Sequence, residues 1–222
     1  MQKKRGQKGA IVFKIHLHKA FDSVDWDFLH KVLIDFNIPA PWIRLIMFSV
    51  TSLQLSVLWN GKELPSFQPQ RGLCQGDPFS PYLFIMVMEK LSHMIQSRVA
   101  SNSWKPFHIS RGGLALAHLF FADDLMLFYN ASLAQVEMVM ECLNEFAEVS
   151  GLDINLSKSK MYVSPNIQSQ VAGGWSAACG IPLTKDLGTY LGVPILHGRP
   201  RASTYKHLRK YKQSYLVGNR TC

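Results

Sequence analysis

Two adjacent aspartates interrupt an apolar stretch of this sequence. Asp123 and Asp124 lie within HLFFADDLMLFY, residues 118–129, where most other residues are hydrophobic or aromatic. An unpaired carboxylate is costly to bury, and a second one beside it disfavours the ionised form further. A divalent cation with oxygen ligands, Mg²⁺ above all, would relieve both effects, which makes the pair a candidate metal site.

A pair of such ions would support one kind of chemistry in particular. Two divalent ions about 3.5–4 Å apart clamp the attacking and leaving oxygens of a phosphoryl transfer. Acidic pairs are also common in solvated turns, so the two aspartates alone leave a plain turn as the alternative.

The charge distribution is compatible with a polyanion as the partner. The net charge is +9, but residues 1–19 and 199–222 carry basic residues and no acidic ones, while the middle has 11 basic and 15 acidic residues. Basic ends suit contact with phosphates, and the alternative is that they are solvated tails. No apolar run is long enough for a membrane span, and the four cysteines show no disulfide or zinc-ribbon spacing.

Five motifs resemble those of reverse transcriptases from non-LTR (LINE-type) retrotransposons, the kind abundant in plant genomes. They occur in the order and spacing of that family, and the resemblance extends from about residue 8 to residue 200. The motifs are HKAFDSVDW (18–26), RGLCQGDPFSPYLF (71–84), FADD (121–124), SGLDINLSKSK (150–160) and YLGVP (190–194).

This resemblance implies a fold and an activity. The fold would be the palm of a right-hand polymerase, with the fingers largely absent and the thumb vestigial. The activity would be RNA-directed DNA synthesis by two-metal-ion nucleotidyl transfer. Its cofactors would be two Mg²⁺ (or Mn²⁺) ions, and its partners an RNA template, a DNA primer and deoxynucleoside triphosphates, in the nucleus or cytoplasm and not at a membrane.

The resemblance also implies roles for individual residues. Asp123 and Asp124 match the paired metal ligands, and Lys158 matches a lysine that protonates the departing pyrophosphate. Phe21 matches the aromatic residue under the sugar of the incoming nucleotide, where it rejects a 2′-hydroxyl. Gln75 and Gly76 match the turn beside the nascent base pair. The segment that grips the primer end corresponds to Tyr190, Leu191 and Gly192.

Each of these residues also has a structural alternative when taken singly. Phe21 would serve equally as a core residue, and Lys158 as a solvated lysine. The segment 75–78 has the composition of an ordinary turn. It is the order of all five motifs that favours the functional interpretation.

One position departs from the family pattern at the metal site. The strand before KAFD typically reads like KIDLEKAYD, and its first aspartate is the third carboxylate, whereas this chain reads KIHLHKAFD and has His16 there. Asp22 matches a non-ligand aspartate. Imidazole is a poor ligand for Mg²⁺, so we expect a severe loss of activity. A zinc site of His16, His18 and His118 is the alternative use of this histidine.

Cys74 is a second departure from the family pattern, and it adds two alternatives to an impaired polymerase. Cys74 stands where the family usually has a basic residue, and both changes can arise from single base substitutions, as in a decaying genomic copy. The chain is then either an impaired polymerase, a non-catalytic nucleic-acid-binding remnant, or a non-functional fragment that does not fold stably alone.

The elements that position these motifs predict an α+β fold, in which helices back one face of an antiparallel sheet. Alternation predicts a strand over 10–18 and two strands that meet at the aspartates. Asn60 and Gly61 predict a hairpin turn. Helices are expected from Trp26 to before Pro39, from Pro41 to about 52, from a Ser80 cap to about 99, and between a Ser132 cap and Gly151.

The remaining segments complete the predicted organisation. Short strands are expected over 161–164 and 190–195. We expect a basic N-terminal segment over 1–9, a palm domain over 10–200 and a basic C-terminal tail over 201–222, with no internal repeat.

Overall fold

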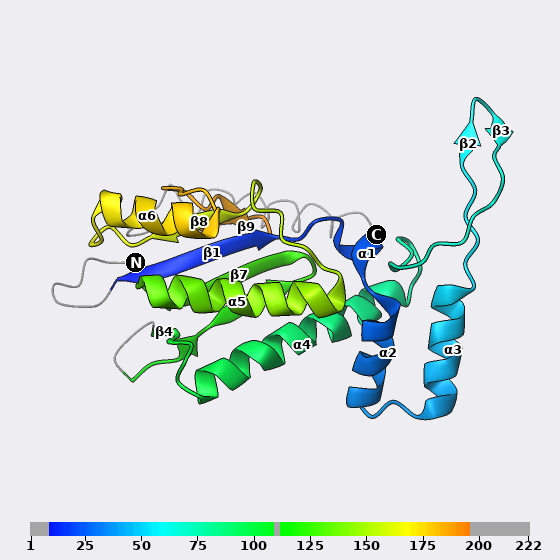
Figure 1. The fold of residues 1–222 in the computed structure, drawn as a ribbon, viewed down its shortest axis with the longest axis horizontal. Coiled ribbons are helices and arrows are strands. Elements are labelled where there is room, and N and C mark those ends of the chain that lie inside the picture. The colour runs from blue at the N-terminus through cyan, green and yellow to red at the C-terminus, as the bar shows by residue number, and fades with distance from the viewer. Residues whose placement is uncertain (1–8, 109–111, 196–222) are drawn as a thin grey trace, which may run out of the picture.

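The centre of the molecule is a four-stranded antiparallel sheet in the order β6-β7-β1-β8 (Figure 1). The computed structural model describes residues 9–108 and 112–195. The strands are β1 (Ala10–His16), β6 (His118–Phe121), β7 (Asp124–Asn130) and β8 (Lys160–Val163). The predicted α+β class is confirmed. The predicted basic ends lie almost wholly outside the described residues.

One face of this sheet forms most of the hydrophobic core. Alternate residues of a strand point to the same side of the sheet, and on this side they are fully buried in the core. We call this the packed face, and its residues are Ile11, Phe13, Ile15, Leu125, Leu127, Tyr129 and Met161. The alternation predicted from the sequence for the first strand is confirmed as far as His16, after which the strand ends.

Helices α4 (Ser80–Ala100), α5 (Leu133–Ser150) and α6 (Ser169–Cys179) are among those that contribute side chains to this core. Figure 1 shows α4 and α5 running along the sheet. The two predicted caps of α5 are confirmed, since Ser132 accepts a hydrogen bond from the Gln135 amide and Gly151 adopts a φ of 74°. The start of α4 is one residue earlier than predicted, because Phe79 and not Ser80 is its N-cap.

The other face of the sheet, which we call the open face, carries both polar and apolar side chains. Its residues are Val12, Lys14, His16, Leu119, Phe121, Asp124, Met126, Phe128, Lys160 and Tyr162. A small second cluster covers part of it with Leu187 and Tyr190, which come from the region of the hairpin β9 (Thr189–Tyr190) and β10 (Val193–Pro194). The face is therefore only partly covered by the described chain.

The segment between β1 and α4 forms an arm beside the sheet. It contains α1 (Ala20–Ser23), α2 (Trp26–Asp35), α3 (Ala40–Thr51), and the hairpin β2 (Leu58–Trp59) and β3 (Lys62–Glu63), which projects away from the sheet in Figure 1. The Asn60-Gly61 turn is confirmed, with φ values of 48° and 75°. The second helix ends four residues before Pro39, which is itself the N-cap of α3, so Pro41 is the second helical residue and not the first.

Two expectations near the C-terminal end of the described chain need correction. The predicted strand over 190–195 is a hairpin, because Leu191 and Gly192 adopt φ values of 51° and 75° and turn the chain back. Helix α6 was not predicted. A further short hairpin joins β4 (Phe107–His108) to β5 (Ala115–Leu116). Among the described helices, none combines the length and hydropathy that a membrane span requires.

Candidate active site

The two aspartates lie at a tight turn between neighbouring strands, as the sequence predicted. Phe121 and Asp124 form the last pair of the β6–β7 ladder, so Ala122 and Asp123 make the turn. Ala122 adopts a φ of 50°, a strained value for a residue with a Cβ. Asp123 is exposed, and Asp124 begins β7 on the open face, partly buried.

His16 faces Asp124 directly across the sheet. The two residues are partners in the β1–β7 register, and His16 Nδ1 lies 3.9 Å from Asp124 Oδ1. The His16 amide donates to Ser159 Oγ at 3.1 Å, and its carbonyl accepts from the Asn155 amide at 2.8 Å. These bonds fix the end of β1 and hold His16 opposite Asp124.

Lys158 belongs to the loop that is bonded to this end of β1. Its amide donates to Asn155 Oδ1 at 3.1 Å, and the side chain is exposed. The structure thus places Lys158 at the same end of the sheet as the two aspartates, within the loop whose Asn155 and Ser159 hold the backbone of His16.

Phe21 lies beside the loop that carries Gln75 and Gly76. The Leu73 amide donates to the Phe21 carbonyl at 2.7 Å, and Trp26 Nε1 donates to the Gly72 carbonyl at 2.8 Å. The Phe21 ring is half-buried and stacks on Phe84 of α4, with ring centroids 4.7 Å apart. The structural and functional interpretations of Phe21 are therefore compatible, since one side of the ring packs on the core.

Glycine is required in this loop for a steric reason. Gly72 has a φ of 93°, and a Cβ there would lie 2.6 Å from the backbone oxygen of Asp22. The close approach brings Gln75 within reach of Asp22, and Gln75 Nε2 donates to Asp22 Oδ1 at 3.3 Å. Asp22 matches a non-ligand aspartate of the family, and its contact with Gln75 is not evident from the sequence because the partners are 53 residues apart.

The β9–β10 hairpin brings Tyr190 toward the aspartates. Burial raises the pKa of Tyr190, and the negative charge of Asp124 adds to this shift. Leu191 and Gly192 form the exposed tip of the hairpin. The Lys14 ammonium on β1 donates to the Thr189 carbonyl at 2.6 Å, which ties the hairpin to the open face.

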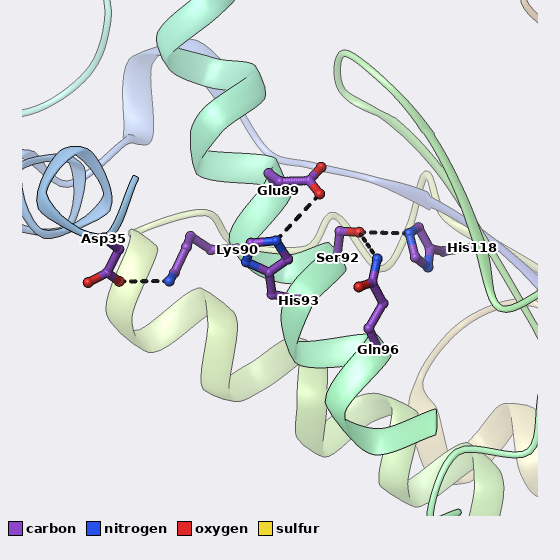
Figure 2. A network of polar contacts seen from close by, with 7 residues as sticks. All are labelled: Asp35, Glu89, Lys90, Ser92, His93, Gln96 and His118. Atoms are coloured by element: carbon purple, nitrogen blue, oxygen red, sulfur yellow. Dashed lines mark hydrogen bonds and ion pairs between the residues drawn. The ribbon is translucent and has the colours of Figure 1, made fainter. Parts of the chain in front are cut away.

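His118 has a different environment from His16, so the structure does not support the zinc alternative. Its register partner is Leu127 on the packed face, and His118 Nε2 lies 3.0 Å from Ser92 Oγ on α4 (Figure 2). Burial lowers the pKa of His118, and Glu89 partly opposes this effect. In Figure 2 the same stretch of α4 bears the ion pair of Lys90 with Asp35 on α2. His118 thus packs the sheet against a helix.

The donor set at the aspartate turn fits a pair of divalent ions incompletely. At this end of the sheet His16 lies opposite Asp124, and Asp123 is exposed in the adjoining turn. Nowhere among residues 9–108 and 112–195 are three or more His, Cys, Asp or Glu side chains grouped as a metal site. Two carboxylates neutralise half of the charge of two divalent ions, and an imidazole adds a ligand that Mg²⁺ disfavours.

Comparison with known sequences agrees with the family resemblance of the five motifs. The profile of the family described as "Reverse transcriptase (RNA-dependent DNA polymerase)" matches residues 1–195. A retrovirus-related Pol polyprotein from the type-2 retrotransposable element R2DM of Drosophila melanogaster is 25% identical over 151 residues, covering 68% of this chain and 13% of that protein. A Pol polyprotein from the type-1 element R2 of Popillia japonica is 26% identical over 198 residues, covering 89% and 26%.

A plant protein is also similar over a shorter stretch. An uncharacterized mitochondrial protein of Arabidopsis thaliana is 36% identical over 77 residues, covering 35% of this chain and 63% of that protein.

Solved structures extend the similarity to the fold. A telomerase from Candida tropicalis, in complex with a fragment of telomeric RNA, matches 97% of this chain and 35% of its own, with a TM-score of 0.59 and 12% identity. The Candida albicans enzyme matches 93% and 34%, with a TM-score of 0.59 and 14% identity. At this identity the likeness shows the fold alone, which is that of a right-hand polymerase.

Proposed function

The chain belongs to the reverse transcriptase (RNA-dependent DNA polymerase) family, and its relatives include Pol polyproteins of non-LTR retrotransposons; we propose that it is an RNA-directed DNA polymerase domain whose synthesis is impaired by His16. The observation that carries the proposal is the pairing of His16 with Asp124 across β1 and β7, with 3.9 Å between Nδ1 and Oδ1.

Asp123 and Asp124 are the residues that would hold divalent ions, which reverse transcriptases generally use. Such ions stabilise the attacking and leaving oxygens of a nucleotidyl transfer. With His16 in place of a carboxylate, the chain supplies too little negative charge for two of them. The loss falls on the group that would hold both ions together, so we expect weak or absent synthesis with Mg²⁺.

The remaining site residues are proposed to position the substrates. Phe21, fixed by its stacking on Phe84, would lie under the sugar of a deoxynucleoside triphosphate. Gln75 and Gly76 would lie along the new base pair, with Asp22 orienting Gln75 through its hydrogen bond. Lys158, with its exposed ammonium, would supply a proton to pyrophosphate.

Nucleic-acid strands are the proposed macromolecular partners. The hairpin tip at Leu191 and Gly192, with Tyr190 beside Asp124, would hold the end of a DNA primer paired with an RNA template. The matched telomerase structures contain RNA, which supports this choice of partner. The chain spans 13% and 26% of the two Pol polyproteins compared above, so the activity of a whole polyprotein is not assigned to it.

Primer extension tests the proposal. The unmodified protein and its His16→Asp variant are compared on an RNA template with a DNA primer and Mg²⁺, under single-turnover conditions. We expect the variant to be at least about 100-fold faster, since changes outside the ligand set of a metal site already cost roughly 10–100-fold. His16→Asp combined with Asp124→Asn is the control, and it should lose the gain.

The outcomes separate the parts of the proposal. Equal and rapid synthesis by the unmodified protein would overturn the impairment. Bound primer–template without synthesis by the His16→Asp variant would overturn the polymerase assignment and favour a non-catalytic nucleic-acid-binding role.

A further inference from the structure

Two lysines are directly opposed on the open face of the sheet. Lys14 of β1 and Lys160 of β8 are register partners, next to the pair formed by Val12 and Tyr162. Side chains at directly opposed positions point to the same side, and like charges placed this way destabilise a sheet. A pair of this kind is retained at a cost in stability unless an anion binds between or beside the two ammonium groups.

The described chain provides no such anion. Neither lysine forms an ion pair within residues 9–108 and 112–195, where the acidic partners of salt bridges serve other residues. Lys14 donates to the Thr189 carbonyl, a neutral acceptor that occupies one of its three N–H groups. Lys160 is exposed. Both ammonium groups therefore retain donors and an uncompensated charge.

The location of the pair indicates which anion would bind. Lys14 precedes His16 by two residues on the same face, a distance of roughly 7 Å along a strand. Tyr190, from the β9–β10 hairpin, packs on the same side against Val12, Met126 and Phe128. One strand of a duplex carries a phosphate about every 3.4 Å along its axis, so the pair lies about two nucleotides from the aspartates.

We propose that Lys14 and Lys160 bind a backbone phosphate of the nucleic-acid strand whose end lies at Asp124, about two nucleotides from that end. This inference rests on the proposed function, because it takes the strand end to lie at the aspartates. Contact of ammonium groups with phosphate reads no base, so the pair contributes affinity without sequence preference. The opposed lysines thus lower the stability of the sheet somewhat and increase the affinity for the nucleic-acid strand.

The salt dependence of binding tests the inference without any need for catalysis. A fluorescent DNA primer annealed to an RNA template is titrated with protein at several salt concentrations. For the variant with Lys14→Gln and Lys160→Gln, we expect the slope of log K against log salt to decrease in magnitude by about 1 to 2. Glutamine keeps a donor for the Thr189 carbonyl.

The matched control removes the same charge elsewhere. Lys31 and Lys62 are exposed residues of α2 and β3, away from the open face, and both are changed to Gln. This variant should keep the original slope. An equal loss of slope in the control would overturn the inference, because net charge alone would then explain the effect.

Replacement of single phosphates of the primer by an uncharged group tests which phosphate the two lysines bind. A methylphosphonate two nucleotides from the primer end should weaken binding by the unmodified protein and have little effect on the Lys14→Gln, Lys160→Gln variant. A methylphosphonate about eight nucleotides away should give both proteins the same small loss. A position-independent loss would overturn the inference.

Two further measurements separate failure of this inference from failure of the proposed function. Single Lys160→Gln should leave the free energy of unfolding unchanged or slightly higher, and a clear decrease would show that the lysine is structural and overturn the phosphate role. Absence of primer–template binding by every variant at about 50 mM salt would overturn the nucleic-acid assignment as a whole. Lysine-dependent binding without synthesis by the His16→Asp variant would overturn only the polymerase activity.

Discussion

The two faces of the sheet are built from the same strands but have different physical roles. On the packed face, Phe13 and Tyr129 are fully buried and their rings meet edge to face, 5.3 Å apart. On the open face, one residue along each strand, Lys14 is half-buried and donates to the Thr189 carbonyl, while Phe128 is buried in the small second hydrophobic cluster. Because strand side chains alternate, most of the hydrophobic core lies on one side of the sheet, and the candidate site residues His16 and Asp124 lie on the other.

This difference explains how the fold tolerates a change at the site. His16 points to the open face, where no core packing depends on it, while its neighbour Ile15 is fully buried on the packed face. Under the proposed function, histidine in place of a third carboxylate would remove a metal ligand and leave the core intact. The expected consequence is a folded domain with a defective site.

Phe13→Ala should produce the largest loss of stability, about 3–5 kcal/mol, because it leaves a cavity under the sheet. Urea denaturation followed by circular dichroism measures it. Lys14→Gln, the neighbouring residue on the open face, should change the free energy of unfolding by less than about 1 kcal/mol. Equal losses for the two variants would contradict the division between the faces.

Substitution of Tyr129, also on the packed face, should change the free energy of unfolding by a smaller amount. Its hydroxyl is buried and has no hydrogen-bond partner among the described residues. Tyr129→Phe should be neutral or stabilising by up to about 1 kcal/mol, since no bond is lost and a desolvated hydroxyl is removed. A loss above about 1 kcal/mol in urea would contradict this, because it would show that the hydroxyl makes a stabilising hydrogen bond in the folded protein.

The same residue predicts a pH dependence. Burial raises the pKa of Tyr129 well above its ordinary value of 10.0, and Cys179 adds to the shift. Above pH 10 the unfolded chain loses this proton while the folded chain keeps it, so stability falls as pH rises. Denaturation at pH 8 and pH 11 should show a smaller decrease for Tyr129→Phe than for the unmodified protein.

His118 gives the smallest expected effect, at acid pH. Its pKa is lowered, chiefly by burial. As pH falls below 6.5, the unfolded histidine takes up a proton that the folded one resists, so the free energy of unfolding decreases. His118→Gln should reduce this decrease between pH 7 and pH 5, whereas a change of the exposed His30 to Gln should not. Identical pH profiles for both variants would exclude His118 as the cause.

Much of the fold could be predicted because short-range chemistry specifies it. The Asn60-Gly61 turn, the Ser132 and Gly151 caps and the turn at Asp123 all depend on residues next to one another. Helix α6 was missed because Gly173 and Gly174 lie inside it, and glycine disfavours helix. The hairpin tip at Leu191 was missed because a leucine rarely adopts a positive φ.

The site was less accessible to sequence reasoning where its contacts are long-range. The order of the motifs indicated the aspartates, and the departure from the family's usual KIDLEKAYD indicated His16. The register that sets Lys14 opposite Lys160 depends on how β8 pairs, 146 residues later in the chain. The Asp22–Gln75 bond and the placement of His118 against Ser92 depend likewise on packing between distant segments.

Binding of Mn²⁺ measures the central claim most directly, namely that the domain is folded and lacks one ligand at position 16. Free Mn²⁺ is followed by electron paramagnetic resonance during titration of protein bound to a primer–template with a terminated primer end. The account predicts that His16→Asp binds Mn²⁺ at least about 10-fold more tightly than the unmodified protein, and that adding Asp124→Asn removes the gain. Equal affinity for the unmodified protein and the His16→Asp variant, with both folded, would contradict it.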